Sequence, residues 1–344
     1  LLKSLRLPTN SEVIIQAFTC EAVILPILAI NLKPIYVDIE TETFSMNYNG
    51  LTNKLTNNSR VLILQHTFGL TPEFRREILI LAQKHKLIVI EDLAHGFNPA
   101  IFKSTDYSLL STNYFLLSFG RSKAFSSVFG GAVISTDNRV TDQLKNLQQP
   151  SSWFILRCLL YKPLAMIIKS TYEFYLGKIL HRICNSFGLL IPEITEKEKA
   201  GNYDSSFNYA YPNALAILLY HQLKKFEQIQ KNRTKIVNFY NQQLKNVTSY
   251  MLHVTDQPLL RYPLLVKNRN LTLIKTRAEN IFLGTWYDNP VAPKGINLER
   301  VGYKLGSCPA AEEICNKIIN LPTNVSEIEA EKIIKIFILS LSKD

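Results

Sequence analysis

The sequence predicts an α/β protein with a mostly parallel central sheet and flanking helices, followed by a smaller C-terminal α+β domain. The first 150 residues alternate short apolar runs with amphipathic stretches of helical period. Such alternation indicates βαβ units and a parallel sheet that is covered on both faces. A length of 344 residues favours two domains. We place the large domain at residues 1–245 and the small domain at residues 246–344.

The apolar runs of the large domain predict six strands. They are Val13–Ala17, Ile35–Asp38, Val61–Gln65, Leu87–Glu91, Tyr114–Phe119 and Ala132–Ser135. Helical patterns lie between them, such as Pro72–His85 with its apolar residues on one face. Ligands of such sheets bind beyond the carboxyl ends of the strands. We therefore expect chemistry at the polar residues that end four of the runs, which are Asp38, His66, Asp92 and Ser118.

The remainder of the chain is expected to be mainly helical. Residues 151–200 are aromatic, aliphatic and basic, and they predict two amphipathic helices broken by Pro163 and Gly177. One long helix is expected at Asn213–Leu244. From about Thr248 we expect the strand Tyr262–Val266, the helix Leu271–Asn280, the strand Phe282–Tyr287, and the helices Ala310–Lys317 and Ser326–Leu341. Ser326 and Glu329 have the spacing of a capping box at the start of the last helix.

The composition excludes wholesale disorder, because 47% of the residues are hydrophobic and 19% are charged. Lysine and arginine number 39 against 28 acids, which gives a net charge of +11. A surplus of this size favours anionic ligands or surfaces, although a solvated basic face without a partner explains it equally well. No cleavable signal and no bilayer-spanning apolar run is recognisable.

The five cysteines are scattered, and they form no CxxC pair and no zinc spacing. They are Cys20, Cys158, Cys184, Cys308 and Cys315. This pattern suggests neither a disulfide framework nor a metal site, and it suits a reducing compartment. We therefore expect a cytoplasmic protein without a metal and without a nucleic-acid partner.

The first motif with chemical content is Val89–Gly96, an apolar strand that ends in two acids and is followed by Leu-Ala-His-Gly. A carboxylate at a strand's end, such as Asp92, can hold the protonated ring nitrogen of pyridoxal phosphate and keep that cofactor an electron sink. The structural alternative is an N-cap, because Asp92 also precedes a helix-like segment.

The second motif is Leu117–Lys123, followed after a short turn by Phe129–Ile134 with its paired glycines. A loop lysine between two strands suits a Schiff base with a cofactor, and the glycines would let the backbone approach a bulky group. Ser118 could contact the cofactor phosphate. Taken alone, a lysine such as Lys123 is more often an ordinary surface residue.

Together the two motifs resemble fold-type I pyridoxal-phosphate enzymes, in which aspartate ends one strand and lysine follows after one more strand. The chain resembles the DegT/StrS family of sugar-nucleotide aminotransferases in particular. Matching segments are QAFTCEAV with PIYVDIETETFSMN, VLILQHTFGLTPEF, VIEDLAHGF, SFGRSKAFSSVFGGAVIS, FNYAYPNALAILLYHQLKKFEQ and CPAAEEICNKIINLPTN. The resemblance covers nearly the whole chain except residues 150–200.

The resemblance implies a role for each matching residue. Lys123 would bond the cofactor and shuttle the proton between the substrate carbon and the cofactor, and Asp92 would pair with the ring nitrogen. Ser118 would contact the phosphate, and Asn208 would reach the phosphate in a neighbouring subunit's site. His95 would lie near the cofactor's phenolic oxygen, where the family often has glutamine. A residue shared between subunits implies at least a symmetric dimer.

Three departures from the family pattern stand out. Cys20 occupies the place where the family usually stacks an aromatic ring on the cofactor. Ala210 replaces the arginine of the family's N-Y-R-M segment. The S-G-T-A phosphate-binding segment is expected just upstream of Leu1, and the opening LLKSLRL reads as the middle of a helix, so we expect an N-terminal truncation.

The resemblance implies amino transfer, because the dehydrating branch of the family carries histidine at the position of Lys123. Glutamate would load the amine onto pyridoxal phosphate, and a keto-sugar nucleotide would receive it for glycan or polysaccharide biosynthesis. A non-catalytic homologue with a sensing or scaffold role remains an alternative, in view of Cys20 and Ala210. Another alternative is a fold-type I lyase or desulfurase, although no cysteine lies in an obvious mobile active loop.

Residues 151–190 lie outside the resemblance and have two possible functions. The segment combines many apolar residues with five cations and a single acid, Glu173. Basic amphipathic helices of this kind can lie at a membrane interface. The same apolar faces could instead cover a partner subunit or the cofactor domain. This many apolar residues are not expected to remain exposed to solvent. We therefore expect one of the two functions, membrane contact or coverage of another part of the protein.

Overall fold

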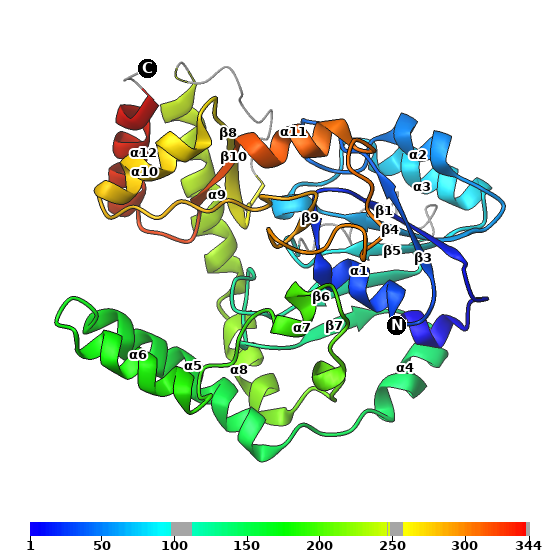
Figure 1. Cartoon of the computed structure of the whole chain (residues 1–344), viewed down its shortest axis with the longest axis horizontal. Coiled ribbons are helices and arrows are strands. Elements are labelled where there is room, and N and C mark those ends of the chain that lie inside the picture. The colour runs from blue at the N-terminus through cyan, green and yellow to red at the C-terminus, as the bar shows by residue number, and fades with distance from the viewer. Residues whose placement is uncertain (98–111, 246, 248–256, 342–344) are drawn as a thin grey trace.

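A computed structural model describes residues 1–97, 112–245, 247 and 257–341, and it is built around a six-stranded sheet (Figure 1). The strand order is β3-β1-β4-β5-β6-β7. Four pairings are parallel, and β7 runs antiparallel to β6. The strands are β1 (Glu12–Gln16), β3 (Lys33–Val37), β4 (Ser59–Gln65), β5 (Ile88–Asp92), β6 (Tyr114–Ser118) and β7 (Gly131–Ile134). All six predicted strands are confirmed, each within two residues at either end.

Helices cover both faces of the sheet, as the alternation of its side chains requires. Ile14 and its same-face neighbours pack on the helices α2 (Tyr48–Lys54) and α3 (Arg75–Lys84). Val13 and Ile15 belong to the opposite core, which includes α1 (Glu21–Leu28) and α9 (Phe226–Leu244). The 3₁₀ turns η1 (Leu2–Leu5), η2 (Thr67–Gly69) and η5 (Ser205–Phe207) and the helix α4 (Asn138–Lys145) complete this part. The mostly parallel, doubly covered sheet is therefore confirmed.

The C-terminal part adds a two-stranded antiparallel sheet of β8 (Arg261–Leu265) and β10 (Ile318–Pro322). Its helices are α10 (Arg269–Ala278), α11 (Pro309–Lys317) and α12 (Glu327–Leu341). Ser326 and Glu329 form the predicted reciprocal capping box. One hydrophobic core extends from Leu5 to Phe337 and so includes both predicted domains. The predicted start of the small unit, near Thr248, lies outside the described residues, and the division into two domains stays a prediction.

Two predictions about the C-terminal half are wrong, and one strand was missed. Phe282–Tyr287 is not a strand, because only Gly284 forms a bridge, to Asn320, and the aromatic pair beyond it turns towards a pocket. Asn213–Leu244 is two helices, α8 (Asn213–Leu223) and α9, because the chain turns where Phe226 enters an aromatic cluster with Phe125. The strand β10 was not anticipated.

Residues 152–186 form a helical hairpin of α5 (Ser152–Ser170) and α6 (Leu176–Ser186), which confirms the two amphipathic helices. Pro163 lies within α5 and does not end it. Gly177 lies inside α6, where a side chain would collide with the Ile168 carbonyl at 2.2 Å, so the glycine allows close packing of the two helices. The short helix α7 (Glu196–Lys199) follows. Within the described part of the chain, no helix combines the length and the apolar character that crossing a membrane requires.

Candidate active site

A cavity of about 1200 Å³ lies at the carboxyl ends of β5 and β6. Its walls come from the start of α1, the loop after β6, the loop before α7 and the segment before β9 (Val291–Ala292). The two-residue strand β2 (Thr19–Cys20) pairs with β9 and so brings the C-terminal part against the cavity. The six residues that the family resemblance places at the cofactor line this cavity: Cys20, Asp92, His95, Ser118, Lys123 and Asn208.

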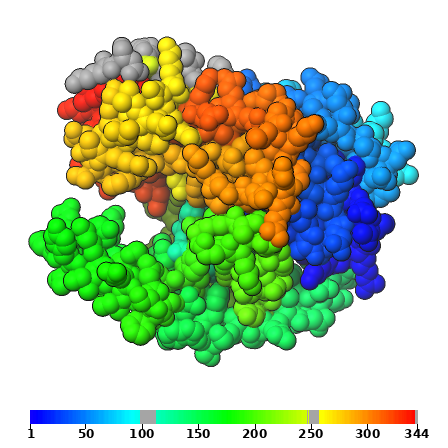
Figure 2. Space-filling model, in the orientation of Figure 1, coloured from blue at the N-terminus to red at the C-terminus, as the bar shows by residue number. Residues whose placement is uncertain are grey.

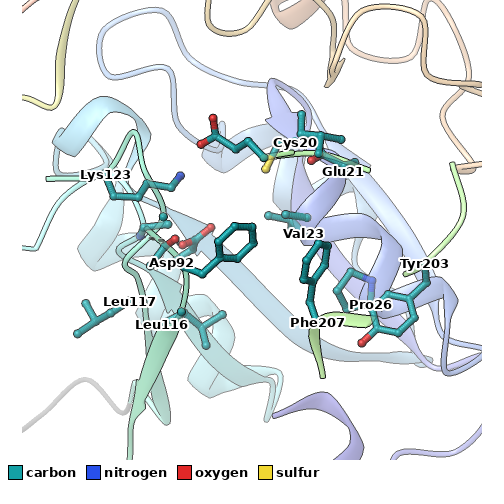
Figure 3. A pocket seen from close by; sticks show the side chains of 18 of the residues that line it. Cys20, Glu21, Val23, Pro26, Asp92, Leu116, Leu117, Lys123, Tyr203 and Phe207 are labelled. Atoms are coloured by element: carbon teal, nitrogen blue, oxygen red, sulfur yellow. Dashed lines mark hydrogen bonds between the residues drawn. The ribbon is translucent and has the colours of Figure 1, made fainter. Parts of the chain in front are cut away.

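Lys123 lies in the loop between β6 and β7 and extends into the cavity (Figure 3). The loop is held by backbone hydrogen bonds, in which the Lys123 amide donates to Gly120 and the Ser127 amide donates to Phe119. The Lys123 ammonium is 5.7 Å from the centre of the Trp286 ring. Its amine is therefore presented inside a partly aromatic cavity and is not an ordinary surface lysine.

Asp92 is the last residue of β5 and is only 8% exposed. Its Oδ1 accepts a hydrogen bond from the Ala94 amide at 2.9 Å. Burial raises the pKa of the carboxyl, while this hydrogen bond and the positive charge of Lys123 oppose the rise. Residues 93–97 form no helix, so Asp92 is not the cap of one. Figure 3 shows it beside Lys123 on the same side of the cavity.

The neighbouring acid, Glu91, fixes the end of β5 from the opposite face. Its carboxylate is fully buried, accepts two hydrogen bonds from Arg75 at 2.8 and 2.6 Å, and lies 2.7 Å from His66 Nε2. Thr112 donates a further bond at 2.6 Å. Burial alone would raise the pKa of Glu91, but the bonds from His66 and Arg75 outweigh it and lower the pKa to about 2. This charged cluster holds the strand that presents Asp92.

Two of the four strand-end residues therefore do not serve the cavity, contrary to the prediction. His66 is buried against Glu91 and is not among the residues that line the cavity. Asp38 accepts hydrogen bonds from the amides of Ala310 and Ala311, both at 2.9 Å, at the start of α11. A carboxylate at a helix N-terminus stabilises that helix, so Asp38 has a structural role.

His95 lies within a column of aromatic rings. Its ring stacks near those of Phe68, Trp286 and Tyr287, at 6.1, 5.5 and 5.8 Å between centroids. Nδ1 accepts from the Phe68 amide, so Nε2 carries the proton and donates to the Tyr287 hydroxyl at 3.1 Å. Burial and the charge of Lys123 lower the pKa of His95, so its ring is neutral. Both of its nitrogens are already engaged.

Cys20 and Glu21 lie at the start of α1, across the cavity from Lys123 (Figure 3). Burial and the adjacent Glu21 raise the pKa of the Cys20 thiol to about 12, so the thiol stays protonated. Glu21 is 5% exposed, and its Oε2 has no hydrogen-bond partner among the described residues. Burial raises the pKa of Glu21 to about 7.

Ser118 and Asn208 occupy the remaining walls. Ser118 ends β6 opposite Gly131. Asn208 accepts a hydrogen bond from the Tyr203 hydroxyl and lines the cavity of its own chain. Its expected reach into a neighbouring subunit stays a prediction.

The paired glycines are required for packing within the chain, and their expected role in admitting a cofactor stays a prediction. Gly130 has φ +114°, and a side chain there would meet the Tyr211 ring at 2.2 Å. A side chain on Gly131 would meet the Leu117 carbonyl at 2.6 Å. The glycines therefore make room for Tyr211 and for the β6–β7 pairing.

Among the residues that line the cavity, the sequence analysis did not predict Glu21, Trp286 and Tyr287. The aromatic pair was assigned to a strand, although the segment GTWYDNP, with glycine and Asn-Pro around it, has the composition of a loop. No sequence pattern indicates that Glu21 is buried, because its burial results from packing of α1 against distant parts of the chain.

Comparison with known proteins points to one class of enzyme. An uncharacterized protein of Methanocaldococcus jannaschii, MJ1066, is 26% identical over 93% of this chain and 76% of its own length. A UDP-N-acetyl-3-dehydro-alpha-D-glucosamine 3-aminotransferase of Acidithiobacillus ferrooxidans is 31% identical over 44% of this chain and 41% of its own length. A GDP-perosamine synthase of Escherichia coli O157:H7 is 29% identical over 41% of this chain and 38% of its own length. These two named relatives are therefore matched over less than half of their length.

Solved structures share the fold. DesV of S. venezuelae superposes with a TM-score of 0.71 at 17% identity, covering 100% of this chain and 81% of that one. The PMP-form of Spr1654, a sugar aminotransferase from Streptococcus pneumoniae, gives 0.69 at 18% identity, covering 99% and 84%. The central sheet is therefore that of fold-type I enzymes.

The cavity suits the cofactor of these enzymes, pyridoxal phosphate. The amine of Lys123, the buried carboxylate of Asp92 and the aromatic wall at Trp286 are groups that bind an aldehyde, a ring nitrogen and a flat ring. The family model that matches residues 1–154 and 180–337 covers both strands that carry these groups, and the chain belongs to the DegT/DnrJ/EryC1/StrS aminotransferase family.

Proposed function

We propose that the protein is an aminotransferase that moves an amino group from glutamate to a keto-sugar nucleotide, in glycan or polysaccharide biosynthesis. The observation that carries the proposal is the joint placement of Lys123 and Asp92 in one cavity, within residues that the family model matches. The cavity volume of about 1200 Å³ suits a ligand as large as a sugar nucleotide. The named relatives act on UDP- and GDP-linked sugars, and the net charge of +11 favours a diphosphate.

Each residue has a defined task in this proposal. Bound pyridoxal phosphate supplies the electron sink that makes the carbon next to the amine acidic. The Lys123 amine would hold the cofactor through its aldehyde, and as a free amine it would carry the proton to and from the substrate carbon. The Asp92 carboxylate binds the ring nitrogen and keeps it protonated, which its burial beside Lys123 supports.

The remaining predicted residues bind and enclose the cofactor. Ser118 contacts the phosphate, and Asn208 contributes to the phosphate site of a neighbouring subunit in a symmetric dimer. His95 would lie near the phenolic oxygen, and its two nitrogens are engaged by the Phe68 amide and the Tyr287 hydroxyl. Cys20 takes the wall position opposite Lys123. We place this dimer in the cytoplasm.

A desulfurase reaction fits the cavity less well. That reaction needs a thiolate that attacks sulfur, whereas burial raises the pKa of Cys20 to about 12. The other four cysteines do not line the cavity. A sensing or scaffold homologue would bind the cofactor without turnover, and an assay separates it from an enzyme.

The test is a screen of the natural full-length protein with glutamate against a panel of keto-sugar nucleotides and simple keto acids. We expect 2-oxoglutarate to form with at least one sugar nucleotide, and we expect the Lys123→Ala variant to produce none. Release of 2-oxoglutarate with keto acids alone would assign a different acceptor. Cofactor binding without any turnover would assign the non-catalytic role.

A further inference from the structure

The hairpin of α5 and α6 is a part of the chain that the proposed chemistry does not use. Its base packs on the body of the protein, where Cys158 is buried with Val128 and Leu215. Beyond the base, the helices extend away from the sheet (Figure 1). The family match ends at residue 154 and resumes at residue 180, so most of the hairpin lies outside the residues that the family model matches. The hairpin is therefore a candidate for a separate function.

The outer end of the hairpin exposes apolar side chains. We call the following residues the hairpin tip: Met166, Ile167, Tyr172, Phe174, Tyr175, Leu176 and Ile179. Phe174 is 76% exposed. Figure 2 shows open space between the hairpin and the C-terminal helices, so these parts of the chain do not cover one another. Several large apolar side chains exposed on one short segment indicate a surface that contacts something outside the chain.

Positive charge predominates on the hairpin as a whole, and Lys169 and Lys178 lie within the segment of the tip. The five cations of the hairpin are Arg157, Lys162, Lys169, Lys178 and Arg182, and its one acid is Glu173, which gives 5 − 1 = +4. None of the five forms an ion pair with a described residue. The Lys178 ammonium lies 4.4 Å from the centre of the Tyr175 ring and 5.5 Å from that of Tyr172. Cations and exposed rings therefore share one surface.

We propose that the hairpin tip docks on an anionic lipid surface, with its rings in the headgroup region and its cations on the lipid phosphates. Aromatic side chains prefer this interface, and basic residues gain from a negatively charged leaflet. A second copy of the chain is a less favourable partner for the hairpin tip, because two hairpins that each carry a net charge of +4 repel each other. The helices of the hairpin are not suited to crossing the bilayer, so the contact is peripheral. The proposal does not depend on the proposed transferase activity.

The first test is flotation of the purified protein with vesicles of phosphatidylcholine alone or with added phosphatidylglycerol. We expect binding to the anionic vesicles only. The double variant Phe174→Ser with Tyr175→Ser should bind at least about tenfold more weakly, because it removes the inserted rings. The matched control is Phe282→Ser with Leu305→Ser, two exposed apolar residues outside the hairpin, of which Phe282 is 74% exposed. This control should bind as the unaltered protein does.

The second test removes charge and keeps the rings. Lys169→Gln with Lys178→Gln should weaken binding about fivefold for each lysine removed, and added salt should weaken it further. Lys84→Gln with Lys332→Gln, which removes two exposed lysines elsewhere, is the control. Circular dichroism and sedimentation of every variant establish that its fold and assembly are unchanged.

Equal binding of the tip variant and its control overturns the proposal. Binding that ignores lipid charge and lysine removal overturns it as well. If the tip variants instead change a dimer into a monomer while the intact protein ignores the vesicles, the hairpin tip is a contact between copies of the chain.

Discussion

Two regions differ in the partners of their side chains. One is the cavity at the ends of β5 and β6, and the other is the hairpin tip. At the cavity edge, Glu91 is fully buried and has three partners from this chain, and Asp92 beside it is held by the Ala94 amide. At the hairpin tip, rings and cations face solvent. The family model matches the first region and omits residues 155–179 of the second. The side chains at the cavity edge are held by partners within the chain, whereas the hairpin tip is the part for which we propose a contact outside it.

We expect the largest effect on activity from substitution of Lys123. Lys123→Ala should lower amino transfer by about 10⁴-fold, because the variant loses both the cofactor bond and the proton carrier. Lys294→Ala, which alters another lysine of the same cavity, is the control and should stay within about tenfold of the unaltered enzyme. Steady-state rates with glutamate and the accepted sugar nucleotide measure the difference. Similar losses in both variants would show that general charge in the cavity matters, and not the position of Lys123.

The next effect is on stability and concerns the buried cluster at Glu91. Glu91→Gln should lower the free energy of unfolding by about 3 kcal/mol, because it leaves the buried Arg75 and His66 facing a neutral amide. Denaturant unfolding at neutral pH measures it. Glu313→Gln, which removes the exposed pair with Lys317, should change stability by less than about 1 kcal/mol. Equal losses of unfolding free energy would mean that burial does not make the ion pairs of Glu91 more stabilising than the exposed pair of Glu313 with Lys317.

Asp92→Asn should retain the fold and lower turnover by about 10- to 100-fold, since the ring nitrogen loses a charged hydrogen-bond partner. The cofactor should still bond to Lys123, and its visible absorbance reports this. Undiminished turnover would mean that Asp92 only orders the turn through its bond with Ala94.

The smallest effect concerns Glu21 and pH. Its folded-state pKa of about 7 lies above the usual value, so the folded protein binds a proton that the unfolded chain releases between about pH 4.5 and pH 7. Stability from this group is therefore present at low pH and is lost as pH rises through about 7. The unaltered protein should lose about 2 kcal/mol of unfolding free energy between about pH 5 and pH 8 that Glu21→Gln retains. Parallel pH profiles of the two proteins would contradict the raised pKa.

The sequence predicted the sheet well because its strands have strong local patterns. Runs such as VLILQ and IVIED are buried on both faces in a parallel sheet, and only short apolar segments satisfy that requirement. The residues at the ends of two such runs, Asp92 and Ser118, do line the cavity. Asp38 and His66 end similar runs, but distant partners, at Ala310 and Glu91, engage them.

The remaining site residues could not be predicted, because contacts far apart in the sequence decide their environment. Trp286 and Tyr287 fit a strand pattern locally, yet their chain segment is anchored by Asn320 and their rings stack with His95. Glu21 begins a helix, where acids are usually exposed, and only packing across the chain buries it.

The most direct test asks which lysine holds the cofactor. The protein is loaded with pyridoxal phosphate and treated with borohydride, and the modified peptide is then located by mass spectrometry. Borohydride makes the bond between cofactor and lysine permanent, so the label marks the lysine that holds the cofactor. We expect the label on Lys123 within the SFGRSKAF segment, and no label in the Lys123→Ala variant. A label on Lys294 or on any other lysine would contradict the assignment of this cavity as the active site.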